Sequence, residues 1–394
     1  MTPVFAASPP GYDIRALRET EFPGADRQLY LNHASTGPLP ERARRALDLF
    51  MRDRGSPFAL PDERLQAILA EGRRCAARLI NADVAEIALA TNTSFGLNLA
   101  ARMLPFERGD IVLVSDMEFP ANVFPWRQLS DKGVTMELVP VTAEGWPDEA
   151  RIMDRMQDRR VRALAISQVQ FHNGYAADLD ALSAVARGTG TWLVVDAIQA
   201  LGHLPFDVRK TPVDILACGA QKWLLGPWGA GFVYVRRELV PELASPLAGW
   251  SAFAGTANYT TLCDYSGSLL DDARRFELIT LPFQDILGMS RALDLLDEVG
   301  VDRIARHLEA IGQPVLEWAD RRGVRVASPR GARSSGMVCL AAADLPGGPE
   351  ALRAAGVATS VREGLLRLAP HCYNTIEEMS RVADLLTSSR PSLP

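Results

Sequence analysis

Short apolar runs alternate with amphipathic stretches along the chain from about residue 85 onward. The runs show no clean alternation of apolar and polar residues, which is typical of strands buried on both faces of a sheet. Such strands, separated by helices, predict a mainly parallel sheet covered by helices on both sides. The seven predicted strands are EIALAT (86–91), DIVLVS (110–115), TMELVPV (135–141), VRALAIS (161–167), TWLVVD (191–196), VDILACG (213–219) and GFVYV (231–235).

The pattern changes after residue 270. Residues 281–300 and 302–323 have the period of long amphipathic helices, and 375–386 predict a closing helix. Four short apolar runs lie between them, at 323–328, 336–343, 357–361 and 365–370. We therefore predict a large α/β domain over residues 31–269 and a smaller α+β domain over 270–394, with residues 1–30 packing on the smaller one.

Composition narrows the function classes. The chain has 394 residues, of which 47% are hydrophobic and 23% charged, as in ordinary soluble globular proteins. A formal net charge of −6 gives no electrostatic reason to bind nucleic acid or an acidic membrane. No export signal or membrane span is expected from the sequence. The five cysteines form no C-x-x-C pair, so we expect no disulfide framework, no metal site and a reducing, cytoplasmic location.

Candidate chemistry begins with the stretch GAQKWLLGPWGAGF (219–232), which places Lys222 directly after a predicted strand. Lys222 could be a surface lysine whose stem lies over Trp223 and Trp228. A phosphate-binding nucleotide loop is excluded, because the required G-x-x-x-x-G-K-[ST] pattern is absent. The third interpretation is a partly desolvated lysine that forms a Schiff base with a carbonyl cofactor.

Other polar residues follow the same set of strands, where open α/β sheets bind their ligands. Thr93 and Ser94 in TNTSFGLN (91–98) open a helix and suit a phosphate, or serve as plain helix caps. Asp196 ends a buried strand in TWLVVDAIQALG (191–202), with Gln199 about a turn later. A carboxylate there could pair with a protonated pyridine nitrogen or could cap a helix.

Two further residues complete the candidate set. Phe119 follows the run IVLVS and could lie over a flat heterocycle, or belong to the core. Arg367 lies inside the apolar run LLRLAP, where a guanidinium could bind a carboxylate ligand or form a structural ion pair with Glu363 or Asp264.

Together these residues are the components of a pyridoxal 5'-phosphate (PLP) enzyme that acts on an amino acid. In their order along the chain, the sequence resembles the class V aminotransferase family of fold type I PLP-dependent enzymes, which includes cysteine desulfurases, kynureninases and isopenicillin N epimerase-like proteins. The resemblance covers nearly the whole chain, through LNHASTGPLP (31–40), SQVQFHNGYAADL (167–179), RFELITLPF (275–283) and RLAPHCYNT (367–375).

The resemblance implies roles for individual residues. Lys222 would form the Schiff base with PLP, and Arg367 would bind the carboxylate of the amino-acid substrate, with Asn32 and His33 also at the substrate. Thr280 would reach the phosphate of the neighbouring subunit in a homodimer, although Ile279 stands where relatives usually have glycine. The remaining implied cofactor contacts are Asp196 to the pyridine nitrogen, Gln199 to the ring hydroxyl, Thr93 and Ser94 to the phosphate, Phe119 stacked on the ring, and Gln221 where relatives often have histidine.

Departures from the family pattern bear on the reaction. Cysteine desulfurases carry a nucleophilic cysteine before the arginine strand, but the corresponding segment VATSVREGLL contains none, and we expect Cys372 to be buried. Epimerisation requires an acid or base on both faces of the cofactor, which Phe119 cannot supply unless His33, His172 or Tyr175 does. We therefore expect β-elimination, as in a carbon–sulfur lyase, or transamination, and favour the lyase.

One interpretation of another class stays open. A non-catalytic relative could use PLP as a sensed ligand, as in transcription regulators with an aminotransferase-like domain. Those proteins carry a DNA-binding module before this domain, and residues 1–30 are too few and insufficiently basic for one.

Overall fold

The computed structural model describes residues 11–256, 260–345 and 348–388. A seven-stranded sheet forms its centre, in the order β2-β8-β7-β6-β5-β3-β4. Five neighbouring strands pair in parallel, and only β8 runs in the opposite direction. This confirms the predicted mainly parallel sheet and its seven strands. Their bounds are β2 Ile87–Ala90, β3 Ile111–Ser115, β4 Thr135–Val139, β5 Val161–Ser167, β6 Trp192–Asp196, β7 Ile215–Gly219 and β8 Gly231–Val235.

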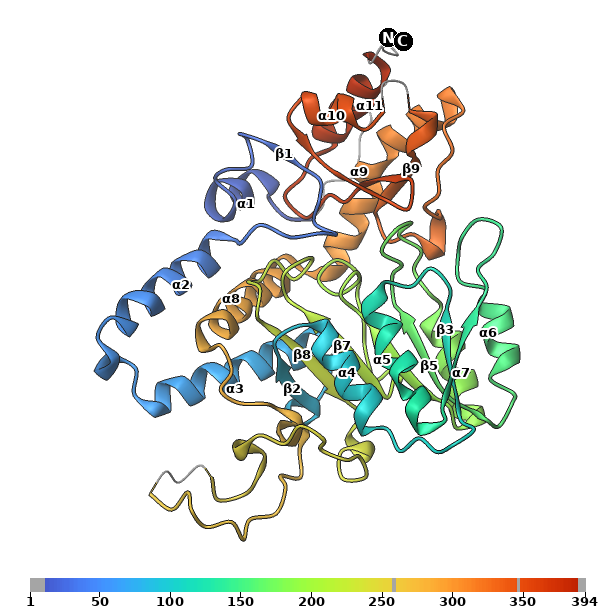
Figure 1. Ribbon diagram of the computed structural model, residues 1–394. Coiled ribbons are helices and arrows are strands. Elements are labelled where there is room, and N and C mark those ends of the chain that lie inside the picture. The colour runs from blue at the N-terminus through green and yellow to red at the C-terminus, as the bar shows by residue number, and fades with distance from the viewer. Residues whose placement is uncertain (1–10, 257–259, 346–347, 389–394) are drawn as a thin grey trace.

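The sheet is buried on both faces, as its continuous apolar runs predict. Successive side chains of a strand point to opposite faces, so Val194 of β6 packs in one core cluster, while Leu193 and Val195 pack in the other. Helix α4 (Thr93–Met103) contributes Leu97 to the first cluster. Helix α7 (Leu179–Thr189) contributes to the second. Helices cover both faces of the sheet (Figure 1). Because neighbouring strands from β4 to β7 pair in parallel, their carboxyl ends lie on the same side of the sheet.

The C-terminal elements lie together at one end of the molecule (Figure 1). This region contains an antiparallel sheet of order β11-β12-β9 and a separate two-stranded parallel sheet of β1 and β10. Tyr12 donates a hydrogen bond to Cys372 O at 2.7 Å, so the first described residues contact this region. The elements are β1 Leu29–Tyr30, β9 Val338–Ala341, β10 Val357–Ala358, β11 Ser360–Arg362, β12 Leu365–Leu368, α1 Ile14–Glu21, α9 Val301–Arg322, α10 Glu350–Ala354 and α11 Ile376–Ser388.

Three helices flank the sheet near its β2 edge: α2 (Glu41–Arg54), α3 (Asp62–Leu79) and α8 (Phe283–Val299). Helix α8 packs on both α2 and α3, although it follows residue 270 in the chain. The predicted domain boundary at 270 stays a prediction. No helix in the described ranges is both long and apolar enough to cross a membrane.

A buried ion pair anchors the segment that precedes α8. Arg73 of α3 donates to both carboxylate oxygens of Glu277, at 2.7 and 2.5 Å, and Leu89 N donates to the same carboxylate at 2.9 Å. Both charged side chains are buried, so their pairing and the backbone donor compensate for lost hydration. This contact fixes RFELIT (275–280) against the edge strand β2.

Two segments between the main elements contain little regular structure. Residues 121–133 form only a four-residue helix, α5 (Phe124–Arg127), flanked by short 3₁₀ turns. Pro125 lies in the first turn of α5 and lacks the N–H that would extend the helix toward residue 121. The run GVRVAS (323–328) makes an isolated bridge from Val326 to Leu340 and forms no strand. Helix α6 spans Glu149–Arg155.

Candidate functional site

Lys222 lies directly beyond β7, in the loop that returns to β8. The chain has three lysines, and Lys132 and Lys210 are exposed whereas Lys222 is partly buried. Burial lowers the pKa of Lys222 to about 8, against the opposing attraction of Asp196. The interpretation of Lys222 as an ordinary surface lysine is therefore wrong, because its amine loses its proton at a lower pH than an unperturbed lysine amine does.

Glycines hold the lysine loop from two sides. Gly37 N donates to Gln221 O at 2.8 Å, and a Cβ on Gly37 would overlap Lys222 O. On the other side, a Cβ on Gly202, which has a φ of +104°, would overlap Trp223 O. The backbone of residues 222–223 thus fits between two segments that only glycine allows to approach so closely.

Two buried carboxylates lie near the lysine. Asp196 ends β6, is 3% exposed and accepts a hydrogen bond from Ile198 N at 3.0 Å. Burial raises the pKa of Asp196, and the negative charge of Glu118 raises it further. Glu118 accepts from Ser167 N at 2.7 Å and from Gln170 Nε2 at 2.8 Å, and burial raises its pKa as well.

Asp196 has no ion-pair partner within 4 Å among the described residues. A buried carboxylate without a close cation is costly, and a protonated ring nitrogen of a ligand would supply that cation. The donor set beside Lys222 therefore fits a cationic heterocycle.

Thr93 lies at the start of α4, next to the end of β7. Its Oγ1 accepts a hydrogen bond from Gly219 N at 2.8 Å. A Cβ on Gly219 would lie 2.6 Å from Gln221 Oε1 and 3.3 Å from Thr93 Oγ1, so Gly219 brings these side chains together. The side chain that caps α4 belongs to Asn92, which accepts from Phe95 N at 2.8 Å, and the plain capping role for Thr93 and Ser94 is therefore wrong.

Gln199 and Phe119 line opposite parts of the same region. Gln199 donates to Ala34 O and accepts from Trp223 Nε1, both at 2.9 Å, which connects it to the lysine loop. The ring of Phe119 lies 5.6 Å from Lys222 Nζ and is 43% exposed, so it is no core residue. Phe171 meets Phe119 edge-on, at 5.3 Å between ring centroids.

Arg367 reaches this region from β12. It is 2% exposed, and its Nη1 and Nη2 donate to Phe171 O at 2.5 Å and Ser35 Oγ at 2.9 Å. Its Nε is buried without a hydrogen-bond partner. Burial lowers the pKa of Arg367 to about 10, which leaves it charged at neutral pH. Neither Glu363 nor Asp264 pairs with it in the described structure, so the structural ion pair considered from the sequence is wrong.

Asn32 and His33, the two substrate residues predicted in LNHASTGPLP (31–40), differ in whether their side chains are free to bind a ligand. The side-chain oxygen of Asn32 is buried without a partner, and its backbone bridges Ala369 beside Arg367. His33 is fully buried, with Nδ1 2.7 Å from Ala369 O and Nε2 2.9 Å from Tyr373 Oη. Both ring nitrogens of His33 are engaged, so we correct the expectation that His33 binds the substrate.

Two predicted cofactor residues, Ser94 and Thr280, have side chains that form no hydrogen bond with the other predicted cofactor residues in the described part of the chain. Ser94 is exposed next to Thr93 on α4, and Thr280 is exposed beyond the anchored Glu277. The structure therefore brings together Lys222, Asp196, Thr93, Gln199, Gln221, Phe119 and Arg367, but not Thr280.

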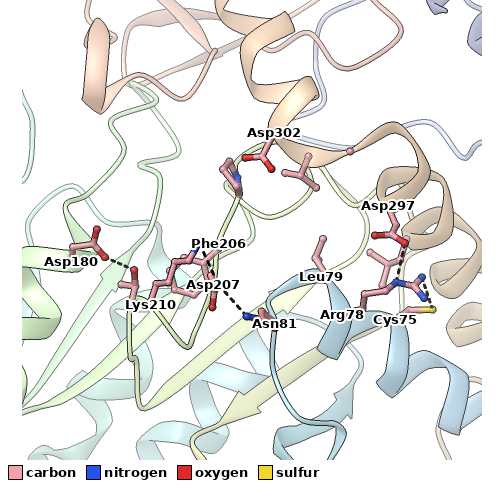
Figure 2. A pocket seen from close by; sticks show the side chains of 15 residues that line it. Cys75, Arg78, Leu79, Asn81, Asp180, Phe206, Asp207, Lys210, Asp297 and Asp302 are labelled. Carbon is pink, nitrogen blue, oxygen red and sulfur yellow. Dashed lines mark hydrogen bonds and ion pairs between the residues drawn. The ribbon is translucent and has the colours of Figure 1, made fainter. Parts of the chain in front are cut away.

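A pocket of about 680 Å³ lies between the end of α3, the loop 205–211 and the α8–α9 junction (Figure 2). None of the predicted site residues lines it. Its polar side chains pair with one another, as Asn81 does with Asp207 at 3.1 Å and Arg78 with Asp297 at 3.1 Å. This pocket presents no convergent set of free groups for a ligand.

Beside that pocket, Glu71, Cys75 and Asp294 have the spacing of a metal-ligand cluster. Arginines already occupy the carboxylates: Arg78 and Arg291 donate to Asp294 at 2.9 and 2.7 Å, and Arg74 donates to Glu71. Cations there would repel a metal ion, so we interpret the cluster as an ion-pair network.

Comparison with known proteins identifies a family and several relatives for this chain. The family model described as "Aminotransferase class-V" matches residues 29–382. An uncharacterized aminotransferase of Bacillus subtilis is 31% identical over 309 residues, which cover 78% of this chain and 80% of that protein. A probable cysteine desulfurase of Methanothermobacter thermautotrophicus is 31% identical over 304 residues, covering 75% and 71%. Among solved structures, the cystine C-S lyase C-DES in complex with its product cysteine persulfide has a TM-score of 0.84 at 22% identity, covering 94% and 100% of the two chains.

Proposed function

The chain belongs to the aminotransferase class-V family and is therefore a PLP-dependent enzyme that acts on an amino acid, and we propose that its reaction is a β-elimination. The observation that supports PLP chemistry at this site is Lys222, a lysine with a lowered pKa beside the buried carboxylate of Asp196. When bound, PLP delocalises the negative charge that develops at the substrate Cα. The rest of the site must orient the substrate and move its protons.

We propose that the cofactor is held by residues from four strand ends. Lys222 would bind its carbonyl carbon, Asp196 its ring nitrogen and Gln199 its ring hydroxyl. Thr93 and Ser94, at the positive end of α4, would bind the phosphate beside Gln221. Phe119 would cover one face of the ring.

Each residue has one task in the reaction. Arg367 would bind the α-carboxylate through its two terminal nitrogens, with Asn32 beside it. The amine of Lys222 would remove the proton at Cα, since a base with a pKa near the working pH transfers protons most efficiently. Phe119 carries no ionisable group, so protons would move on the lysine face only.

The cysteines favour elimination over persulfide formation. Cys372 is fully buried, as the sequence predicts, and burial raises its pKa. Cys339, opposite Arg367 on β9, is also buried. The relatives named cysteine desulfurase and cystine C-S lyase support cleavage of a carbon–sulfur bond.

Transamination and epimerisation remain the alternatives. The aminotransferase name of the Bacillus relative favours the first. An epimerase would need a second base. Of the residues considered, Tyr175 stacks on Trp146 at 5.6 Å, and His33 has both nitrogens engaged, whereas Nδ1 of His172 is buried without a partner. His172 is therefore the residue to substitute if D-amino acids form.

The experiment is to offer S-substituted cysteines to the holoenzyme and to assay pyruvate, keto-acid transfer, D-amino acids and protein persulfide in parallel. β-Elimination predicts pyruvate and ammonia without enzyme-bound persulfide. A persulfide on Cys372, or D-amino acid without pyruvate, would contradict the proposed reaction. A PLP-binding protein without turnover of any amino acid would favour the non-catalytic sensing role.

The lowered pKa of Lys222 predicts how cofactor capture depends on pH. Only the neutral amine attacks a carbonyl, so the rate at which the cofactor-free protein binds PLP covalently should rise with pH and reach half its maximum near 8. The rate is followed by absorbance after mixing. Nα-acetyllysine is the control, since its amine should titrate near 10.4. A midpoint near that of the control would contradict the burial of the Lys222 amine.

We infer that the active form is a homodimer in a reducing compartment, the cytoplasm. Large apolar side chains are exposed between residues 250 and 265, and a pocket of about 470 Å³ lies among them. Contiguous exposed apolar surface of this kind marks an interaction site. The exposed apolar side chains are Trp250, Phe253, Leu262 and Tyr265.

The reducing compartment is inferred from the cysteines, all five of which are free.

The dimer would bring Thr280 of one subunit to the phosphate of the other. Thr280→Ala should then weaken PLP binding by about 1.5–3 kcal/mol, the contribution of a hydrogen bond to a charged group. The PLP dissociation constant measures this, with Thr375→Ala as a control in the small domain. Sedimentation of an active monomer would contradict the dimer.

A further inference from the structure

Two arginines converge on one hydroxyl group at the substrate side of the site. Arg367 Nη2 donates to Ser35 Oγ at 2.9 Å, and Arg362 Nη2 lies 3.5 Å from the same oxygen. The arginines come from the two strands of one hairpin, where Arg362 is opposite Leu365 and Arg367 is opposite Ser360. Their relative position is therefore set by paired backbone and does not depend on a free loop.

The two guanidinium groups lack an anionic partner. Within the described ranges, neither lies within 4 Å of a carboxylate, and Arg362 donates otherwise only to the carbonyl of Val361. Arg362 is exposed, whereas Arg367 is 2% exposed. The positive charge of Arg362 lowers the pKa of Arg367 and also that of Lys222, so it acts on the centre of the site.

Like charges held this closely repel each other, and a neutral hydroxyl offsets little of that repulsion. One carboxylate bound by Arg367 would neutralise a single charge. The second guanidinium, at the exposed side of Ser35, would still face the substrate side chain without a counter-charge. The arrangement therefore suits a ligand that carries two anionic groups.

We propose that Arg362 binds an acidic group on the substrate side chain, and that the substrate is an amino acid with a short acidic side chain or an acidic substituent on sulfur. The inference rests on the proposed function, in which Arg367 binds the α-carboxylate. Arg362 would determine specificity and would take no part in moving protons.

The test measures binding of unreactive acids to the holoenzyme, by calorimetry and by the change in cofactor absorbance. Glutarate and its monoamide have the same shape and differ by one charge. Glutarate should bind at least about tenfold more tightly, which is the lower range for a hydrogen bond to a charged group. Arg362→Ala should reduce this ratio to below about twofold while leaving the affinity for the monoamide unchanged.

Two further variants complete the comparison. Arg362→Lys should retain part of the preference, since it keeps the charge without the planar fork. Arg353→Ala removes an exposed arginine of α10 as the matched control and should leave the ratio unchanged.

The inference is overturned if the parent protein binds both acids equally, or if Arg362→Ala weakens both to the same extent, which would assign Arg362 to the α-carboxylate. Binding of neither acid would also overturn it. The proposed function stands in each of these cases if the PLP chromophore forms and amino acids are turned over, and it falls with the inference if no chromophore appears.

Discussion

Lys222→Ala should abolish turnover of every amino acid while the protein still folds and binds PLP without a covalent bond. The substitution removes the amine that we propose to bind the cofactor and to act as the base. General acid–base catalysis alone contributes about 10²–10⁴-fold, so activity should fall by at least that factor. Asp196 and Thr93, the proposed partners of the ring nitrogen and the phosphate, remain in place. Steady-state assays and the absorbance spectrum measure the two effects separately.

The other two lysines provide the control for this substitution. Lys132 and Lys210 are exposed, and neither contacts the predicted site residues. Lys132→Ala and Lys210→Ala should keep the parent spectrum and activity. Retention of more than a few per cent of activity by Lys222→Ala would assign the proton transfer to another residue.

Arg367→Ala should raise KM for amino acids by about 30-fold or more, because loss of a buried bidentate ion pair costs on the order of 2–5 kcal/mol. The cofactor spectrum should stay normal, since the hydrogen bonds of Arg367 go to Ser35 and Phe171 and not to Asp196 or Lys222. Kinetics with a good substrate provide KM and kcat separately.

A conservative variant separates charge from geometry at this position. Arg367→Lys keeps the positive charge but loses the paired donors, so it should recover only part of the affinity. The melting temperature of each variant checks folding, because Arg367 is buried and its side chain fills space next to Cys339. If the parent enzyme accepts amines without a carboxylate as well as amino acids, Arg367 has another role.

The sheet could be predicted from the sequence because its strands are buried on both faces. Runs such as IVLVS and WLVVD have no polar alternation, and only a covered parallel sheet hides them fully. The helices α2 and α3 were not predicted, since they are rich in arginine and acidic residues. Helix α2 buries only Ala43 and Phe50, and α2 and α3 both pack against the later helix α8.

The candidate site could be predicted in part for a related reason. Lys222, Asp196 and Thr93 each follow or flank a strand end, and the topology of a parallel sheet brings strand ends together. Arg367 was recognised because a charge inside an apolar strand needs an anion. The contacts between these residues could not be read from the chain, because they depend on segments that meet only in the folded protein.

Three residues of the site are missing from the set predicted from the sequence. Ser35 lies in a segment that showed no periodic pattern, and its contact with Arg367 joins residues 332 positions apart. Phe171 contributes its carbonyl group, which no side-chain pattern reveals. Glu118 stands next to Phe119 and could have been noticed, since an acidic residue just beyond a buried strand is as unusual as Asp196 at the end of one.

The small number of lysines allows a direct test of the claim that Lys222 forms the Schiff base with PLP. The chain has 42 lysine and arginine residues together, but only three of them are lysines. Arginine replaces lysine well on surfaces but cannot form a Schiff base at neutral pH, so a partly buried lysine among so many arginines indicates chemistry that needs an amine.

The measurement is borohydride reduction of the PLP-loaded protein, followed by mass mapping of the modified peptide. A Schiff base at Lys222 predicts one pyridoxyl group per chain, attached to this lysine. A modification on Lys132 or Lys210, or no modification of a protein that has been incubated with PLP, would contradict it.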